Sequence, residues 1–310
     1  MRAIKKYLIF GVIAILVLLM VVTLGCKKTT EKTTGKKLVF AFSNVQSNNP
    51  ATLLRIKGMK EYLDKQGVEL LVAGGELDIN KQIADVENFI AKKVDAIILQ
   101  PLDSKAIVPV IEEANKAGIP VIMEDINAEG GKTEGFVHGD CYMAGYLVGE
   151  ELGKRMNGEG EVAIINYPMV SSVRAFEAGE VAALSVYPDI KIVARQVGGA
   201  PEANIATVEN WIKTYPNLKG IIAPNDAMAF DALTAVKAAG KEEQIMICGI
   251  GGIPEAVEEI KKGGAFIASS YWDLELEGRM AAELALKVVK GEEILLREIV
   301  IPVALIKQEK

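Results

Sequence analysis

The chain has 310 residues, of which 50% are hydrophobic and 25% are charged, and its formal net charge is −6. This length can hold two α/β lobes, each with its own core. The negative charge argues against a nucleic-acid partner, because phosphate binding requires a basic surface. A single histidine, His138, argues against a histidine-based metal site and a Ser-His-Asp triad, and no cofactor is expected. Three cysteines cannot form a disulfide framework; Cys141 and Cys248 are expected to be small buried residues whose pairing stays open.

The N-terminus has the pattern of an export signal. Three basic residues among the first six precede Tyr7–Val22, which is almost wholly apolar. A permanent membrane anchor is the alternative, and the length nearly permits it. However, Leu24-Gly25-Cys26 resembles the lipobox of bacterial lipoproteins, in which the cysteine is lipidated and becomes the new N-terminus. We therefore predict a lipoprotein signal peptide over residues 1–26, lipidation of Cys26, stable anchoring by several acyl chains and a solvated tether over residues 27–37.

From residue 38 onward, buried strands alternate with amphipathic helices. In the first half, strands are expected over residues 38–43, 70–73, 94–100 and 119–123. Helices are expected over residues 53–63, from the capping residue Asp78 to 90, and over 105–117. This order with short connections predicts a doubly wound parallel sheet.

The second half repeats the alternation. Strands are expected over residues 162–165, 190–194, 220–223, 245–250, 265–270 and 299–306, and helices over 141–156, 173–185, 203–215, 227–239 and 274–290. Residues 116–122 and 261–267 are loosely similar in sequence. This internal similarity favours two α/β lobes over one long sheet.

Polar residues stand where several of these strands end. The apolar strand at 119–123 runs into Glu124, Asp125 and Asn127, which would be costly to bury within the core. Other polar residues at strand ends are Gln100, Asp103, Asn166, Asn225 and Asp226. Ligands of open α/β sheets bind at the carboxyl ends of the strands. The pattern therefore predicts a cleft for a small, hydroxyl-rich ligand.

Asp125 and its neighbour Glu124 could be considered an acid–base pair. Adjacent residues of a strand point to opposite faces, however, whereas two catalytic carboxylates must converge. We therefore interpret Asp125 as a hydrogen-bond acceptor for the ligand; a merely solvated strand end is the alternative.

Two further positions could bind the same ligand. Arg174 begins a helix, and its fixed donors suit hydroxyl groups or a carboxylate, although a surface arginine is the simpler interpretation. Tyr271 and Trp272 follow the strand at 265–270. A flat aromatic face can pack on the C–H face of a sugar ring; core burial is the alternative.

Several short motifs together resemble the substrate-binding proteins of sugar ABC transporters, in the ribose-binding branch of the periplasmic-type binding proteins. The resemblance covers residues 37–307 and rests on Asn48-Asn49-Pro50, Pro120-Val-Ile-x-x-Asp125, Gly139-Asp140, Ser172-Val-Arg174, Pro224-Asn-Asp-Ala-Met228, Gly249-Ile-Gly-Gly252 and Lys290-Gly-Glu292. It implies two Rossmann-like doubly wound parallel-sheet lobes joined by three crossover hinges near residues 137–140, 268–272 and 300–302.

The resemblance also implies domains and ligand contacts. The N-terminal lobe would comprise residues 38–138 and 271–300, and the C-terminal lobe 139–270 and 301–310. The implied ligand contacts are Asn49, Asp125, Arg174 and Asn225, with Trp272 nearby. Asn127 and Tyr271 are also predicted to contact the ligand, because each lies at a strand end close to one of these residues. Two aromatic residues usual in the family are Ala51 and Thr52 here, an arginine is Ile126 and an aspartate is Gly251, which argues against plain ribose as the ligand.

The sequence therefore predicts a monomeric, lipid-anchored extracytoplasmic receptor, not an enzyme, that delivers a monosaccharide-like ligand to an ABC permease. A furanose-like quorum signal, a polyol and a modified pentose stay open as ligands. A sugar-responsive transcription regulator has a similar core but needs an N-terminal helix-turn-helix in place of the lipobox. An enzyme would need a convergent nucleophile and base, which the sequence does not indicate.

Overall fold

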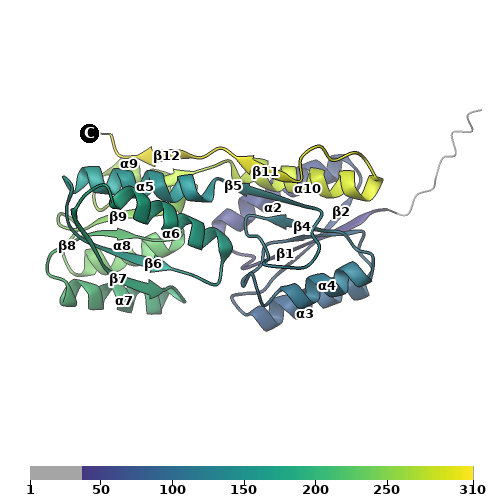
Figure 1. Cartoon of the computed structure of the whole chain (residues 1–310), viewed down its shortest axis with the longest axis horizontal. Coiled ribbons are helices and arrows are strands. Elements are labelled where there is room, and N and C mark those ends of the chain that lie inside the picture. The colour runs from purple at the N-terminus through teal and green to yellow at the C-terminus, as the bar shows by residue number, and fades with distance from the viewer. Residues whose placement is uncertain (1–36, 310) are drawn as a thin grey trace, which may run out of the picture. The chain divides into compact units, whose positions relative to one another are not determined.

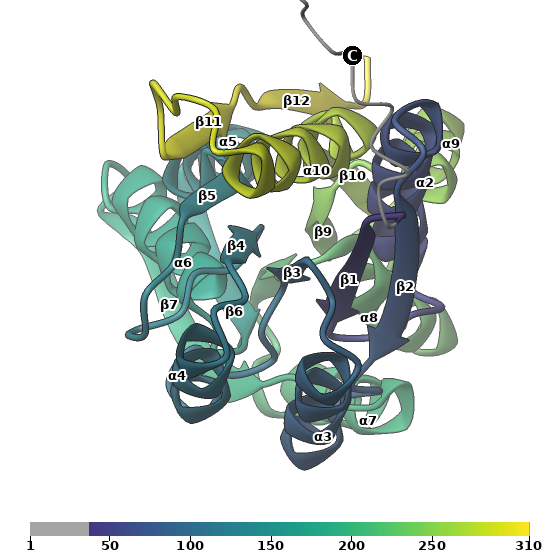
Figure 2. The same cartoon turned by 90° about the vertical axis from the view of Figure 1, so that its right-hand side faces the viewer.

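The computed structural model describes residues 37–309 and contains two six-stranded sheets (Figure 1). The first sheet consists, in spatial order, of β11 (Glu298–Ile301), β5 (Gly135–Gly139), β4 (Val121–Glu124), β3 (Ala96–Leu99), β1 (Val39–Asn44) and β2 (Glu69–Gly74). All of its strand pairs are parallel. Helices α2 (Pro50–Lys65) and α10 (Leu274–Lys290) cover one face, and α3 (Ile79–Ala91) and α4 (Val108–Lys116) cover the other (Figure 2). We call this the N-terminal lobe.

The second sheet has the order β12 (Ala304–Lys307), β10 (Phe266–Tyr271), β9 (Met246–Gly251), β8 (Leu218–Ile222), β6 (Glu159–Asn166) and β7 (Asp189–Val197). It is parallel except for the antiparallel pair of β10 and β12. One face carries α5 (Cys141–Arg155) and α6 (Ser171–Leu184), and the other carries α7 (Pro201–Thr214), α8 (Asp226–Ala238) and α9 (Pro254–Lys262). We call this the C-terminal lobe.

The buried strands explain the two-sided layering. Ile98 of β3 packs in one core cluster with Met59 and Leu63 of α2, whereas its neighbour Ile97 packs in another with Val86 of α3. Successive side chains of a strand point to opposite faces, so a strand that is apolar throughout needs helices on both sides. The predicted architecture of two doubly wound α/β lobes is confirmed.

Glycines allow the covering helices to approach closely. A Cβ on Gly58 would lie 1.9 Å from the carbonyl oxygen of Glu275, and one on Gly278 would lie 2.2 Å from that of Arg55. Gly145 and Gly179 have the same role between α5 and α6, because a Cβ on either would lie 2.0 Å from a carbonyl oxygen of the facing helix. Each lobe thus has one helix pair in backbone contact, and in the N-terminal lobe this contact brings Arg55 next to α10.

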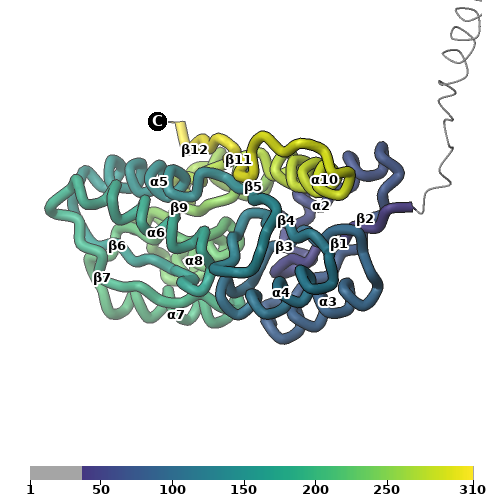
Figure 3. Tube along the Cα trace, turned by 45° about the vertical axis from the view of Figure 1, so that its right-hand side comes forward, coloured from purple at the N-terminus to yellow at the C-terminus, as the bar shows by residue number. Residues whose placement is uncertain are grey.

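Within residues 37–309 the chain changes sheets three times, after Gly139, Tyr271 and Ile301. Figure 3 shows the Cα trace along which these changes can be followed by the element labels. The last change differs from the single strand predicted over residues 299–306. Pro302 has no backbone N–H and fixes its φ angle, and the run is divided between β11 in one lobe and β12 in the other. The sequence analysis also missed β5 and α9, both of which are short.

Several predictions for the N-terminus lie outside the described residues: the signal peptide over residues 1–26, the lipidated Cys26, and the tether apart from Lys37. Within the described part of the chain, none of the helices has the length and apolar character to cross a membrane. Cys141 and Cys248 are both buried and free.

Candidate functional site

A cavity of about 520 Å³ lies between the two lobes, at the carboxyl ends of their strands. Residues of both lobes line it: Val45, Asn49, Ala51, Thr52, Arg55, Glu76, Leu77, Gln100, Leu102, Asp125, Ile126, Tyr167, Val170, Ser172, Val173, Phe176, Gly199, Ala200, Pro224, Asn225, Met228, Ile250, Gly251, Trp272 and Leu274. Of the polar residues at strand ends, Asp125, Gln100 and Asn225 line this cavity, whereas Asp103, Asn166 and Asp226 do not.

Arg55 is the central charged group of the N-terminal wall. Its Nε lies 2.7 Å from Glu124 Oε1 and 2.8 Å from Glu277 Oε2. Its Nη2 lies 3.2 Å from Asp125 Oδ1. Burial lowers the pKa of the guanidinium, but Asp125, Glu277 and Glu124 more than offset that effect and raise it. Arg55 is therefore a fixed cation surrounded by three carboxyl groups.

Two of these carboxyl groups are too buried to be ordinary acids. Burial raises the pKa of Glu124 well above its usual value, against the opposing effect of Arg55. Burial likewise raises the pKa of Glu277 to about 7. The two groups flank the same Arg55 Nε atom. The pair therefore carries less than its full two negative charges near neutral pH.

Asp125 presents its carboxylate at the cavity from a strained position. Its φ angle is 59°, in the left-handed region that non-glycine residues seldom adopt. Besides Arg55, it is held by Gln100, whose Nε2 donates to Oδ2 at 2.8 Å. Local strain of this kind persists where the surroundings over-determine it. The Asp125 carboxylate is thus preorganised rather than adaptable.

Asn49 and Asn225 occupy matching places in the two lobes. Each caps the helix that follows it: Asn49 Oδ1 accepts from Ala51 N, and Asn225 Oδ1 accepts from Met228 N, both at 2.9 Å. Both residues line the cavity. The capping bonds use only the oxygen of each amide, so the Nδ2 donors are available to a ligand.

Trp272 lines the cavity and is buried. Its Nε1 donates to Glu277 Oε2 at 2.9 Å, and its ring lies 6.3 Å from that of Phe176. The hydrogen bond fixes the ring while one part of it faces the cavity. Tyr271, by contrast, is 38% exposed and is not among the lining residues; its ring lies next to Gly252.

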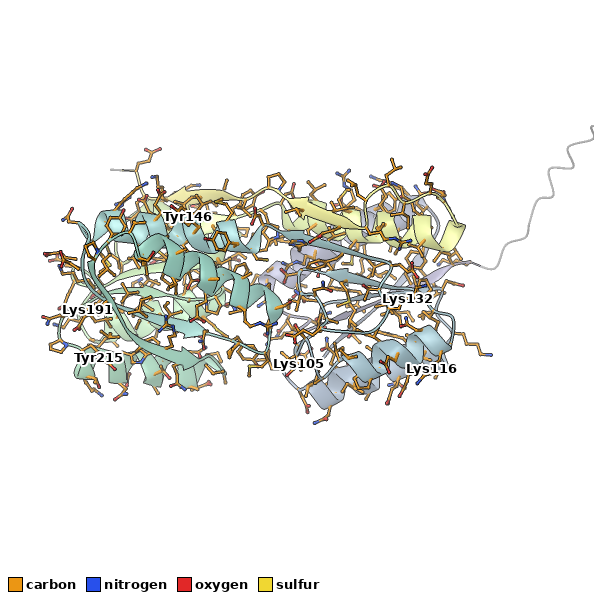
Figure 4. The ribbon with its side chains drawn as sticks, in the orientation of Figure 1. Lys105, Lys116, Lys132, Tyr146, Lys191 and Tyr215 are labelled. Atoms are coloured by element: carbon orange, nitrogen blue, oxygen red, sulfur yellow. The ribbon has the colours of Figure 1, made fainter. Side chains whose placement is uncertain are left out.

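Arg174 and Asn127 lie outside this cavity. Arg174 Nη1 donates to Pro168 O at 2.6 Å, and the other end of the guanidinium pairs with Glu129. With Lys105, which Figure 4 labels, these residues line a separate hollow of about 390 Å³. Asn127 instead donates its backbone N–H to Ser171 Oγ. Both residues therefore take part in contacts between the lobes.

Comparison with known proteins shows the family. The model of the periplasmic binding protein domain matches residues 40–293. The chain belongs to the periplasmic binding proteins. These are solute-binding proteins rather than enzymes. Among the described residues, no group of three or more histidines, cysteines or carboxylates could hold a metal ion.

This periplasmic binding protein is similar to several characterised ones. It is 30% identical over 263 residues to the ribose import binding protein RbsB of Bacillus subtilis, covering 84% of each chain. It is 30% identical over 241 residues to a xylitol-binding protein of Mycolicibacterium smegmatis, covering 77% of this chain and 68% of that one. The structure of an ABC transporter periplasmic solute binding protein from Actinobacillus succinogenes with bound D-allose has a TM-score of 0.80 and 32% identity, and the match covers 88% of this chain and 98% of that one.

Arg55 and Phe176 are among the cavity residues of this periplasmic binding protein that sequence reasoning missed. Arg55 stands four residues before Met59 and eight before Leu63 on the buried face of α2, so helical periodicity could have placed it inside. Phe176 shares the buried face of α6 with Ser172 and lies two residues after Arg174. Residues two apart on a helix do not share a face, which is why Phe176 lines the cavity and Arg174 does not.

Proposed function

We propose that this protein is an extracytoplasmic, lipid-anchored receptor that captures an uncharged monosaccharide or polyol between its lobes and delivers it to an ABC permease. The observation that carries the proposal is the fixed group of Asp125, Gln100 and Arg55 at the edge of the cavity. Such preorganised acceptors and donors suit hydroxyl groups, which both donate and accept. The named ligands of similar proteins (ribose, xylitol and D-allose) are all uncharged and rich in hydroxyl groups.

The charge of the site favours a neutral ligand. Arg55 is the only cationic side chain that lines the cavity among the described residues, and three carboxyl groups already surround it. A phosphate or carboxylate of the ligand would have to displace one of them within a buried cluster. We therefore expect sugar phosphates and sugar acids to be rejected.

Ligand binding is coupled to closure of the two lobes about their hinges. A ligand that contacts both lobes stabilises their closed arrangement and shifts the population toward it. Hydrogen bonds to charged groups contribute about 1.5–3 kcal/mol each. A few of them reach the −8 kcal/mol or so that micromolar affinity requires.

The test has two stages. Mass spectrometry of small molecules released from the natively purified protein identifies any ligand that co-purifies. Isothermal titration calorimetry then measures D-ribose, D-allose, xylitol and myo-inositol, each beside a phosphorylated counterpart. We expect micromolar or tighter binding of at least one neutral compound and none of its phosphate. Failure of every neutral polyol, or equal binding of the phosphates, would contradict the proposal.

A further inference from the structure

The two walls of the cavity differ in polarity. Among the described lining residues, the charged side chains Arg55, Glu76 and Asp125 all come from the N-terminal lobe. The wall from the C-terminal lobe has no charged side chain among the described lining residues. Its surface is formed largely by Val170, Val173, Phe176, Pro224, Met228 and Ile250.

The charged groups nearest to the C-terminal wall are used elsewhere. Arg174 is turned away toward Pro168 and Glu129. Asp226 is buried, and its Oδ2 accepts from Ile253 N at 2.9 Å while its Oδ1 accepts from Ser269 Oγ at 2.6 Å. Neither residue lines the cavity. Among the described lining residues of this lobe, only Tyr167, Ser172 and Asn225 offer side-chain nitrogen or oxygen atoms to the cavity.

A ligand that fills the cavity therefore meets unlike surfaces on its two sides. A hydroxyl group enclosed against Val173 or Phe176 would lose its water without gaining a partner, which weakens binding. A methyl group or a ring C–H face at the same place would gain from leaving water. The hydroxyl groups of the ligand belong on the other side, where Asp125, Gln100 and Asn49 can pair with them.

We propose that the cognate ligand is amphipathic: a monosaccharide or cyclitol with adjacent hydroxyl groups on one edge and a deoxy carbon, methyl or O-methyl group on the other. The apolar edge faces Val173, Phe176 and Met228 of the C-terminal lobe. This inference rests on the proposed function and narrows its ligand class.

Matched ligand pairs test the proposal by calorimetry: D-allose with 6-deoxy-D-allose, D-ribose with 5-deoxy-D-ribose, and myo-inositol with a mono-O-methyl inositol. We expect the less polar member of at least one pair to bind about fourfold tighter or more, because burying one carbon group contributes roughly 0.8 kcal/mol, which is a fourfold gain in affinity. Equal or weaker binding of the less polar member in every pair that binds overturns this proposal alone. If no member of any pair binds, the proposed function fails and this proposal fails with it.

Variants of the C-terminal wall of the cavity provide a second test of the proposal. Val173→Thr replaces a methyl group by a hydroxyl at nearly the same volume, and Met228→Gln replaces a thioether by a polar amide of similar length at a second, half-buried position. Each should reduce the preference for the less polar ligand at least threefold. Val186→Thr is the matched control, because Val186 is 62% exposed and outside the cavity. Melting curves verify that each variant is folded. An unchanged preference in both wall variants overturns the proposal.

Discussion

Ser171 joins the two lobes through Asn127. Its Oγ accepts from the backbone N–H of Asn127 and donates to the carbonyl oxygen of the same residue, both at 3.0 Å. The backbone N–H of Ser171 donates in turn to Ser104 Oγ at 3.1 Å, and that of Ser104 donates to Met169 O at 3.1 Å. These contacts lie next to the Arg174–Glu129 pair. Together they form a latch between the lobes that involves no ligand atom.

The latch should set how long a ligand stays bound. Ser171→Ala removes both bonds to Asn127, each of which contributes about 0.5–1.5 kcal/mol. The two bonds together contribute about 1–3 kcal/mol, so we expect the dissociation rate to rise roughly 5- to 150-fold. Stopped-flow fluorescence measures it with whichever neutral compound binds in the calorimetry described under the proposed function. Ser185→Ala is the control, because that exposed hydroxyl bonds only to Ala182 O of its own segment. A dissociation rate equal to that of the unmodified protein would rule out the latch.

Arg174 and Asp125 should differ in their effect on affinity, although the sequence suggested both as ligand contacts. Arg174 and Glu129 are partly exposed, with 42% and 33% of their side chains accessible, and such pairs contribute about 0–1 kcal/mol. Arg174→Ala should therefore weaken binding less than about fivefold. Asp125→Asn keeps a residue that tolerates the left-handed backbone but removes the charged acceptor, and it should weaken binding at least about tenfold. Calorimetry decides. A tenfold loss of affinity for Arg174→Ala that persists in high salt would show that Arg174 contacts the ligand.

Arg55 should be essential for stability as well as for the site. Arg55→Met leaves Glu124, Asp125 and Glu277 without their buried cation. Removing one partner of a buried ion pair costs about 3–5 kcal/mol, so the free energy of unfolding in urea should fall by about that much. Lys57→Met is the matched control on the same helix, since its pair with Glu275 is largely exposed, and it should change stability little. Similar losses in the two variants would show that the cluster has no special role.

Stability should decline as pH rises through neutrality, and Glu180 should account for part of that decline. Burial, reinforced by Glu177 and opposed by Arg195, raises the pKa of Glu180 from 4.5 to about 8. The folded chain therefore holds this proton more tightly than the unfolded chain. Its contribution is fully present below pH 4.5 and is lost as pH rises toward 8, and each unit of difference in pKa corresponds to about 1.4 kcal/mol.

Urea unfolding of Glu180→Gln between pH 4.5 and 8.5 measures this contribution. The variant should lose less stability across the range than the unmodified protein, because glutamine has no proton to release. Glu209→Gln changes an exposed glutamate of α7 and should leave the pH dependence as it was. Identical slopes for Glu180→Gln and the unmodified protein would mean that Glu180 is ionised in the folded state.

The proposed lipidation of Cys26 can be tested through processing of the precursor. Cys26→Ser removes the thiol that would carry the lipid, so the precursor should escape cleavage at that residue and lack thioether-linked lipid. Intact-mass spectrometry and membrane fractionation measure both effects. Cys141→Ser is the control, because that thiol is buried in the folded chain. Unchanged mature mass and membrane retention in Cys26→Ser would disprove the anchor.

Much of the fold could be predicted because it depends on local pattern. Short apolar runs such as Ile97–Leu99, bounded by polar residues, favour strands covered on both faces. Asp78 caps its helix as expected, accepting from Asn80 N at 2.8 Å. Asp125 and Asn225, which the strand-end rule singled out, both line one cavity. These inferences need only the sequence, because burial and capping act over a few neighbouring residues.

Only the tertiary structure decided which polar side chains are paired with other groups of the protein. Arg174 pairs with Glu129 across the lobes, and Arg55, 222 residues from Glu277 in the chain, is paired with it inside the cavity wall. Such partners meet only after the helices have packed, since a charge buried away from water must find a counter-charge wherever the fold brings one. The sequence by itself determined the two lobes and placed several polar residues at the strand ends that border the cavity. The long-range pairing of charges decided which side chains remain free to hold it.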